Sequence, residues 1–339
     1  MMGSFRKRLL LMLSGLVAAG AIAAGAGYWF VMDVRNQSLA LTGEPQRVIL
    51  ARGETLATLA SELGERGIVR DPLRLQAYGR ISGRANRLQA GEYRLTPGMD
   101  VDAMLTAMET GEVVEYRLTV VEGWRFSEML EAIREHDAVE TRLADAQPAL
   151  IMDRIGADGD EPEGRFLPQT YHFPRGTTDE ALLRRAHRAM EEVLADAWAE
   201  RQEGLPLDSP YEALILASII EKETSLAAER RRIAGVFVRR LKRGMRLQTD
   251  PTVIYGMGES YDGNIRREDL RRDTPYNTYT RHGLPPTPIA LPGEAAVRAA
   301  VDPAEGDALY FVAKQGGGHK FSETLEEHNR AVRRHQLGQ

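Results

Sequence analysis

The chain has 339 residues, 43% of them hydrophobic and 27% charged, which is enough for one large or two medium domains with buried cores. Its net charge is −5. The first 32 residues carry three basic groups and no acid, so the other residues carry −8, the total less those three positive charges. Such an acidic body argues against nucleic acid as the main partner. The absence of cysteine excludes disulfides, thiol catalysis and cysteine metal sites.

The N-terminus has the pattern of a membrane anchor. Residues 9–32 contain no charge, and three basic residues at positions 6–8 precede them. The span is long enough to cross a bilayer, and its basic flank predicts that residues 1–8 form a cytoplasmic tail. We therefore expect a single-pass protein of the inner (cytoplasmic) membrane with the rest of the chain outside the cytoplasm. The alternative is a cleaved signal peptide, because residues 18–27 are rich in small side chains. The length of the span and the aromatic residues at 28–30 favour a retained anchor.

A small domain is predicted after the anchor. Residues 33–47 are polar and read as a linker, and residues 48–115 predict an α+β unit. The pattern is a short strand, a turn with Thr55 as helix N-cap, a helix, a second helix over 72–79 and a strand over 91–95. With GET at the first turn and AGEYRL at the last strand, this β-α-α-β order resembles a LysM module, a fold that binds peptidoglycan. The alternative is a generic small α+β unit.

Residues 116–339 predict a larger mixed α/β domain, so the fold class of the whole chain is α+β. The acidic segment 138–163 is expected to be irregular or mobile, with room for a short helix. The other predicted elements are a helix over 100–110 that closes the small domain, a strand over 116–121, and helices over 127–135, 178–201, 211–228 and 229–242.

An acidic pair stands at the end of the apolar helix over 211–228. Glu223 follows Ile220 by three residues and extends the apolar stripe, whereas Glu221 lies about 200° around the helix from Glu223. Burial of Glu223 would raise its pKa and keep it protonated near neutral pH, as a general acid for glycosidic bonds requires. The alternative is that Glu223 pairs with an arginine such as Arg230 or Arg231.

Two polar loops supply candidate substrate-binding groups. Sugar clefts need hydrogen-bonding side chains for hydroxyls and aromatic faces for the apolar side of the ring. Turn formation or core packing is the alternative role for each of these residues. The candidates are Gln248, Thr249, Asp250, Tyr255, Asn277 and Tyr279.

No metal site or cofactor is predicted. The histidines show no HExxH or comparable spacing, and no Gly-rich phosphate loop or Ser/His/Asp signature occurs. His319 is the most suggestive of the histidines because three glycines precede it. A flexible loop with a surface histidine is the expected structure there.

Long motifs connect these features. LASIIEKETS, ERRRIAGVFVRRLKRGMRLQTDPTVIYGMG and TPYNTYTRHGLPPTPIALPG, followed by ALYFVA, GHKF and EHN, resemble the YceG/MltG family of endolytic murein transglycosylases over essentially the whole chain. The resemblance implies that the catalytic acid, on a buried helix, is the glutamate immediately before threonine in EKET, which is Glu223. At position 169 this chain has Gln169 where the family's LPDTY-like pattern has an acid, which puts any catalytic role of that position in doubt.

The resemblance also implies the reaction. Protonated Glu223 would protonate the oxygen between N-acetylmuramic acid and N-acetylglucosamine, and then take the proton of the muramic acid C6 hydroxyl as that hydroxyl attacks C1. The product is a 1,6-anhydro end on a nascent peptidoglycan strand, which would terminate elongation. The implied partners are glycan strands and peptidoglycan synthases (penicillin-binding proteins). The alternatives are a non-catalytic glycan-binding scaffold of the envelope and a muramidase-type hydrolase that leaves reducing ends.

Overall fold

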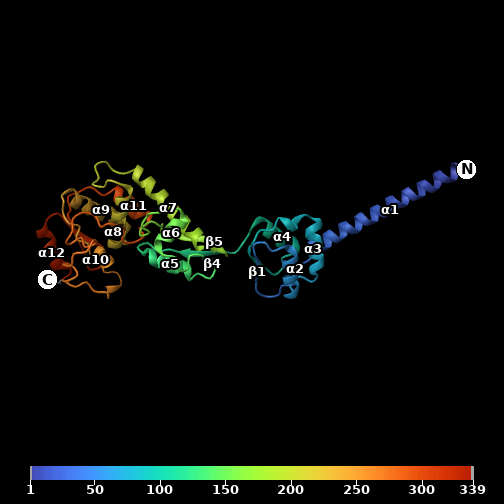
Figure 1. The fold of residues 1–339 in the computed structure, drawn as a ribbon, viewed down its shortest axis with the longest axis horizontal. Helices are drawn as coiled ribbons and strands as arrows, with labels where there is room; N and C mark the ends of the chain where they lie inside the picture. The colour runs from blue at the N-terminus through green and yellow to red at the C-terminus, as the bar shows by residue number, and fades with distance from the viewer. Residues whose placement is uncertain (1, 337–339) are drawn as a thin grey trace. The chain divides into compact units, whose positions relative to one another are not determined.

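The structure, a computed structural model, describes residues 2–336, with side chains from Leu10 on, and divides into two compact units (Figure 1). The first unit runs up to Tyr116 and includes Phe173–Gly176. The second comprises Arg117–His172 and the chain from Thr177 on. In the described part, the strands form two-stranded pairs among many helices, which makes this a mixed α/β chain.

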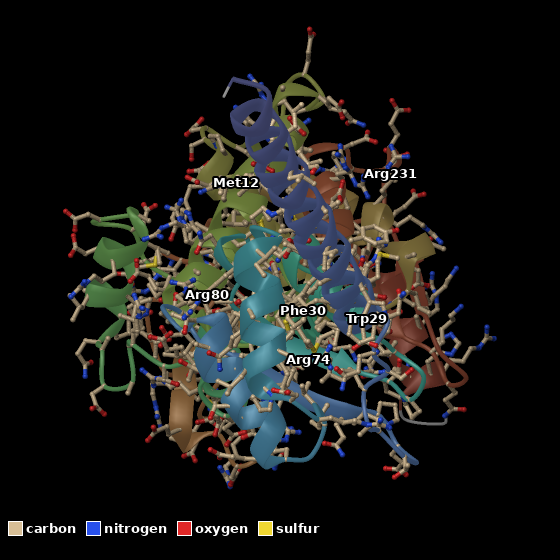
Figure 2. The ribbon with its side chains drawn as sticks, turned by 90° about the vertical axis from the view of Figure 1, so that its right-hand side faces the viewer. Met12, Trp29, Phe30, Arg74, Arg80 and Arg231 are labelled. Carbon is tan, nitrogen blue, oxygen red and sulfur yellow. The ribbon has the colours of Figure 1, made fainter. Side chains whose placement is uncertain are left out.

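The chain begins with one long apolar helix, α1 (Met2–Arg35). Its segment Leu10–Arg35 is long and apolar enough to cross a membrane, a test that a signal sequence near the N-terminus also passes. The C-terminal end of α1 is tied to the first unit by Arg74, which pairs with Asp33 at 2.6 Å and lies over the ring of Phe30 at 5.3 Å (Figure 2).

The first unit is built around one antiparallel pair of strands. β1 (Gln46–Leu50) pairs with β2 (Gly91–Leu95) along its whole length, and two helices connect them, α2 (Leu56–Glu65) and α3 (Pro72–Ile81). Side-chain oxygens cap each helix: Thr55 caps α2 and Asp71 caps α3. The unit also contains the 3-10 turn η1 (Arg84–Asn86) and α4 (Val101–Thr110), capped by Asp100.

The segment before β1, predicted to be part of a polar linker, differs from that expectation. Leu39 and Leu41 are buried in the core of the first unit. The backbone N–H of Leu39 donates to Met99 O at 2.8 Å, and that of Ala40 donates to Ile68 O at 2.8 Å. Alternate residues of an extended chain share a face, so both leucines pack inward although most of their neighbours are polar.

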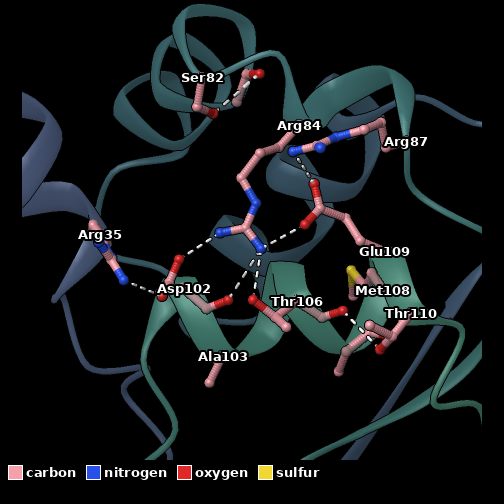
Figure 3. Close-up of polar contacts among 12 residues, drawn as sticks. Arg35, Ser82, Arg84, Arg87, Asp102, Ala103, Thr106, Met108, Glu109 and Thr110 are labelled. Carbon is pink, nitrogen blue, oxygen red and sulfur yellow. Dashed lines mark hydrogen bonds and ion pairs between the residues drawn. The ribbon is translucent and has the colours of Figure 1, made fainter.

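A polar network joins helices of the first unit (Figure 3). Arg84, only 7% exposed, donates to Asp102, to Thr106 Oγ1 at 2.7 Å and to Glu109 at 2.8 Å. Arg35 of α1 reaches the same Asp102 at 2.9 Å. One guanidinium thus ties η1 to α4, and its carboxylate partner ties α4 to α1.

A second network surrounds Glu92 on β2, whose side chain is 3% exposed. Its carboxylate accepts from Arg47 at 3.1 Å, from Arg175 at 2.6 Å and from the hydroxyl of Tyr116 at 2.7 Å. Burial by itself would raise the pKa of Glu92, but the bonds from Tyr116 and Arg175 outweigh it and hold that pKa below its ordinary value. Glu92 is therefore a carboxylate that is neutralised within the fold.

The second unit surrounds α8 (Pro210–Glu223), which is buried on all sides from Ala213 to Ile220. It packs against α11 (Glu294–Val301), α9 (Ala227–Lys242) and α7 (Asp179–Ala199). The other helices are α5 (Phe126–Arg134), α6 (Pro148–Ile155), α10 (Asp250–Met257), η2 (Gly258–Ser260) and α12 (Leu325–His335). The strands pair as β3 (Glu115–Thr119) with β5 (Thr170–Pro174), β4 (Val139–Glu140) with β6 (Thr177–Thr178), and β7 (Tyr310–Ala313) with β8 (His319–Ser322).

Two local expectations for this unit are corrected. The acidic segment 138–163, expected to be irregular or mobile, contains the short helix for which it had room, α6, and is also ordered by β4, which pairs in parallel with β6. The helix predicted over 211–228 ends at Glu223, because Thr224 is extended at φ −152° and its hydroxyl accepts the N–H of Leu226 at 3.0 Å. Glu223 is therefore the last residue of α8, where the chain turns away.

Candidate active site

The carboxyl group of Glu223 is desolvated and has no arginine partner among the contacts of the described residues. Its Oε1 accepts a hydrogen bond from the hydroxyl of Thr249. Burial raises the pKa of Glu223, the Thr249 bond lowers it, the negative charge of Asp250 raises it and the charge of His319 lowers it. Burial dominates, so the pKa lies above its ordinary value and the acid form is favoured.

The neighbouring acid Glu221 has a different environment. Its side chain is 5% exposed, pairs with Arg230 at 3.4 Å and accepts the backbone N–H of Gly293 at 2.9 Å. Arg231 pairs instead with Asp302 at 2.9 Å. Neither of the two arginines considered as partners of Glu223 therefore pairs with it. Because α8 is buried on all sides, helical phase does not separate the two glutamates; their different partners do.

Glu223 opens onto a cavity of about 580 Å³. Four of the six predicted substrate-binding residues line this cavity, namely Gln248, Thr249, Asp250 and Tyr279. Its other lining residues are Arg240, Leu247, Tyr310, Phe311, Val312, Ala313, His319, Leu325, His328, Asn329, Val332 and Gln336. Hydroxyl, amide, carboxyl and aromatic groups thus surround one desolvated carboxyl group, as recognition of a sugar polymer requires.

The loop that carries Thr249 is held rigidly. Gln248 has φ +52°, a left-handed conformation that costs a non-glycine residue about 1 kcal/mol or more. The backbone N–H groups of Gln248 and Thr249 both donate to Thr278, to its carbonyl at 3.2 Å and to its hydroxyl at 3.1 Å. Arg240 donates to the carbonyl of Leu247 at 2.8 Å. These bonds fix the hydroxyl that contacts Glu223.

Tyr279 and Asp250 form a second polar pair on the cavity wall. The tyrosine hydroxyl donates to Asp250 Oδ1 at 2.6 Å. Burial raises the pKa of Tyr279, and its bond to Asp250 raises it further, so this phenol stays protonated at neutral pH. The Asp250 of this pair is the negative charge that raises the pKa of Glu223.

Asn277, predicted to contact substrate, lies outside this cavity. It is 1% exposed, and its amide nitrogen donates to the carbonyls of Asp269, Leu270 and Arg272 at 2.7–3.2 Å. Its Oδ1 accepts the N–H of Tyr279 at 2.9 Å. All of these bonds stay within one loop, so Asn277 shapes the loop that presents Tyr279.

Tyr255, the other predicted binding residue outside the cavity, contacts a glutamate that sequence reasoning missed. Its hydroxyl donates to Glu163 at 3.2 Å, and the guanidinium of Arg125 lies over its ring at 5.1 Å. Burial raises the pKa of Glu163 to about 7, against the hydrogen bonds from the N–H of Phe126 and from Tyr255. No sequence signal marked Glu163, because its burial depends on loops far apart in the chain.

His319 was expected on a flexible surface loop and is instead the first residue of β8 on the cavity wall, with its side chain 14% exposed. The three glycines before it form the left-handed turn of the β7–β8 hairpin. Its Nδ1 lies 2.7 Å from Glu229 Oε2. The GHKF motif was the signal that could have identified this residue. Gln169, by contrast, is exposed and does not line the cavity.

Among the residues that the structure describes, no three His, Asp or Glu side chains come close enough to hold a metal ion. What the cavity offers is proton chemistry. A carboxyl group kept in its acid form by burial, with a single hydroxyl bond and no cation clamped to it, can protonate a bound oxygen. Fixed hydroxyls and aromatic rings around it can orient a carbohydrate chain.

Comparison with known proteins gives consistent results. The model of the YceG-like family matches residues 48–334. A Bacillus subtilis protein named endolytic murein transglycosylase is 32% identical over 82% of this chain and 81% of its own length. A Streptococcus pneumoniae protein of the same name is 28% identical over 95% of this chain, which spans 64% of that longer protein. A solved YceG-like protein of Listeria monocytogenes, 29% identical, matches 86% of this chain and all of its own with a TM-score of 0.52.

Proposed function

We propose, from the premise that this chain belongs to the YceG-like family, that it is an endolytic murein transglycosylase with Glu223 as its catalytic acid. The observation that carries the proposal is the surroundings of Glu223: a carboxyl group whose pKa is raised by burial, bonded to one threonine hydroxyl, at the wall of a polar and aromatic cavity. The relatives named transglycosylases supply the substrate class.

The mechanism follows from a single carboxyl group. In its acid form Glu223 donates its proton to the oxygen between N-acetylmuramic acid and N-acetylglucosamine, and positive charge develops at C1 with support from the substrate's acetamido group. As a carboxylate, Glu223 then takes the proton of the C6 hydroxyl while that oxygen attacks C1. The bond to the leaving sugar breaks, the 1,6-anhydro bond forms, and the carboxyl group regains its proton. Exclusion of water favours ring closure over hydrolysis.

The cavity residues have distinct parts in this proposal. Thr249 holds the carboxyl group in position through its hydroxyl. Gln248, Asp250 and Tyr279 offer an amide, a carboxylate and a phenol to sugar hydroxyls. Tyr310 and His328, whose ring centroids lie 5.2 Å apart, add aromatic groups to the cavity lining for contact with sugar rings.

We assign two further roles to the N-terminal part. The apolar helix α1 anchors the chain in the cytoplasmic membrane and leaves the catalytic unit outside the cytoplasm. The βααβ unit from β1 to β2 is a LysM-like module that binds or spaces the glycan. A membrane-anchored enzyme of this kind meets nascent strands where peptidoglycan synthases release them, which makes those synthases its partners.

Digestion of purified sacculi tests the assignment. The full-length chain in detergent should release 1,6-anhydro-muropeptides, and Glu223→Gln should reduce that release by a factor of about 10²–10⁴, as loss of a general acid does. Glu221→Gln is the matched control because Glu221 is tied to Arg230 outside the cavity lining. Equal release by wild type and Glu223→Gln would remove Glu223 from the mechanism. Reducing ends, heavier by one water, would identify a hydrolase, and no product from wild type would favour a glycan-binding scaffold.

A further inference from the structure

The β7–β8 hairpin brings a second titratable group to the cavity of Glu223. His319 pairs with Ala313 in the strand register and lines the same cavity as Glu223. The ring of Phe311 meets the imidazole edge to face at 5.3 Å. A strand residue beside an aromatic side chain has few alternative rotamers, so the position of the ring is well defined.

Glu229, in the first turn of α9, holds this imidazole at two points. Its Oε1 accepts the backbone N–H of His319 at 2.9 Å, and its Oε2 lies 2.7 Å from Nδ1. Gly318 permits the close approach: it has φ +71°, and a Cβ there would lie 2.7 Å from Glu229 Oε1. A carboxylate acceptor at Nδ1 fixes the tautomer and orientation of a histidine and stabilises the imidazolium that forms on protonation. Glu229 contacts the ring through Nδ1, so Nε2 takes no part in this bond.

The charges around Glu223 oppose each other. Asp250 raises the pKa of Glu223 and His319 lowers it. The burial of Glu229 would raise its own pKa, but the bonds from His319 keep it below the ordinary value, so Glu229 remains a carboxylate. The other charged or titratable groups that line the cavity or act on this pair are Arg240, Tyr279, Tyr310, Lys314 and His328.

We propose that Glu229 and His319 form a charge-setting pair for the catalytic carboxyl group: Glu229 orients the imidazole, and the protonated ring stabilises the carboxylate that Glu223 becomes after donating its proton. A single-carboxyl mechanism requires a buried group to exist for a moment as an anion, which is costly without a nearby positive charge. No proton passes through His319 in this scheme, because the proton leaves Glu223 for the glycosidic oxygen and returns from the C6 hydroxyl. His319 is thus a positioning residue that acts through Glu223, and its role rests on the function proposed above.

The pH profile of anhydro-muropeptide release by the full-length chain is the first test. Activity falls at high pH as Glu223 loses its proton in the substrate complex. His319→Gln removes the positive charge. The high-pH limb of the activity profile should therefore move to higher pH by on the order of one pH unit. Glu229→Gln should move it in the same direction, His319→Lys should return it toward wild type, and His172→Gln, at an exposed position on β5, should leave it in place. A uniform loss of rate at every pH with an unmoved limb would overturn the proposal.

A second measurement does not depend on activity. Carboxyl ¹³C NMR of glutamate-labelled protein, with Glu223→Gln as the assignment reference, follows the titration of Glu223 directly. The titration midpoint of Glu223 should rise in His319→Gln and not in His172→Gln; equal midpoints would overturn the pair. If wild type makes no anhydro product, the proposed function fails, whereas the titration still decides whether His319 acts on Glu223.

Discussion

Two glutamates with desolvated carboxyl groups, one in each unit, have opposite surroundings. Glu92 is enclosed by two arginines and a tyrosine hydroxyl, and its pKa is held below the ordinary value. Glu223 has one threonine hydroxyl and a pKa raised by burial. The same side chain is therefore a neutralised structural anion in the first unit and, in the function that we propose, a proton carrier in the second. The number of cations bonded to the carboxyl group, rather than burial alone, separates the two roles.

The largest expected effect concerns a third glutamate, the buried Glu163, which like Glu223 has no bonded arginine among the described residues. Folded Glu163 keeps its proton up to about pH 7, whereas an unfolded glutamate releases it near 4.5. Between these pH values unfolding releases a proton. The free energy of unfolding therefore falls by about 3 kcal/mol as the pH rises from 4.5 to 7. Thermal unfolding of the second unit from pH 4 to 8 checks this. Glu163→Gln should flatten the profile, and an equally steep profile in the variant would refute the assignment.

The next largest effect is expected for Glu92, the neutralised carboxylate of the first unit. Glu92→Gln keeps the size of the side chain but removes the charge that Arg47 and Arg175 neutralise, so it should destabilise the first unit by about 2 kcal/mol. Glu223→Gln should not destabilise the second unit at neutral pH and should stabilise it, because the folded state favours the protonated acid whereas an unfolded glutamate is ionised there, a cost that glutamine does not have. Hydrogen exchange reports each unit separately. Similar losses from both substitutions would erase the contrast between the two glutamates.

Removal of the single hydroxyl bond to Glu223 should have a moderate effect. Thr249→Val keeps the shape of the side chain but frees the carboxyl group, and we expect about a tenfold fall in kcat, the equivalent of one hydrogen bond. Thr249→Ser retains the hydroxyl and serves as the control. Turnover of both variants on sacculi is the measurement, and a fully active Thr249→Val would show that the bond does not position the acid.

The smallest effect is expected at the edge of the cavity. Tyr279→Phe removes the 2.6 Å bond to Asp250 and leaves the ring in place. Without that bond the Asp250 carboxylate can rotate and become hydrated, so activity should fall about threefold. That factor corresponds to a rise of somewhat less than 1 kcal/mol in the activation free energy. Steady-state rates together with the affinity for glycan strands check this. A loss as large as that of Glu223→Gln would place Tyr279 in the proton-transfer step itself.

Many local signals in the sequence agree with the structure, although the local bond of Thr224 ends α8 earlier than predicted. Thr55 caps the helix that it was expected to cap. The uncharged N-terminal run is one long apolar helix. The acidic pair Glu221 and Glu223 stands at the end of an apolar helix, as the run of hydrophobic residues predicted. Capping, apolar length and helical runs depend on neighbours within a few residues, which a single sequence contains.

The sequence by itself thus determined the mixed α/β class, the apolar N-terminal helix and the position of Glu223 near the end of its helix. The tertiary structure decided which groups meet: it gave Arg230 to Glu221 and Thr249 to Glu223, and it brought His319 from a hairpin 96 residues further along the chain to the same cavity. It also placed the side-chain amide of Asn277 in hydrogen bonds within its own loop. Hydrogen bonds, burial and the pKa values that follow from them depend on distances between remote segments, and no spacing along one sequence specifies those distances.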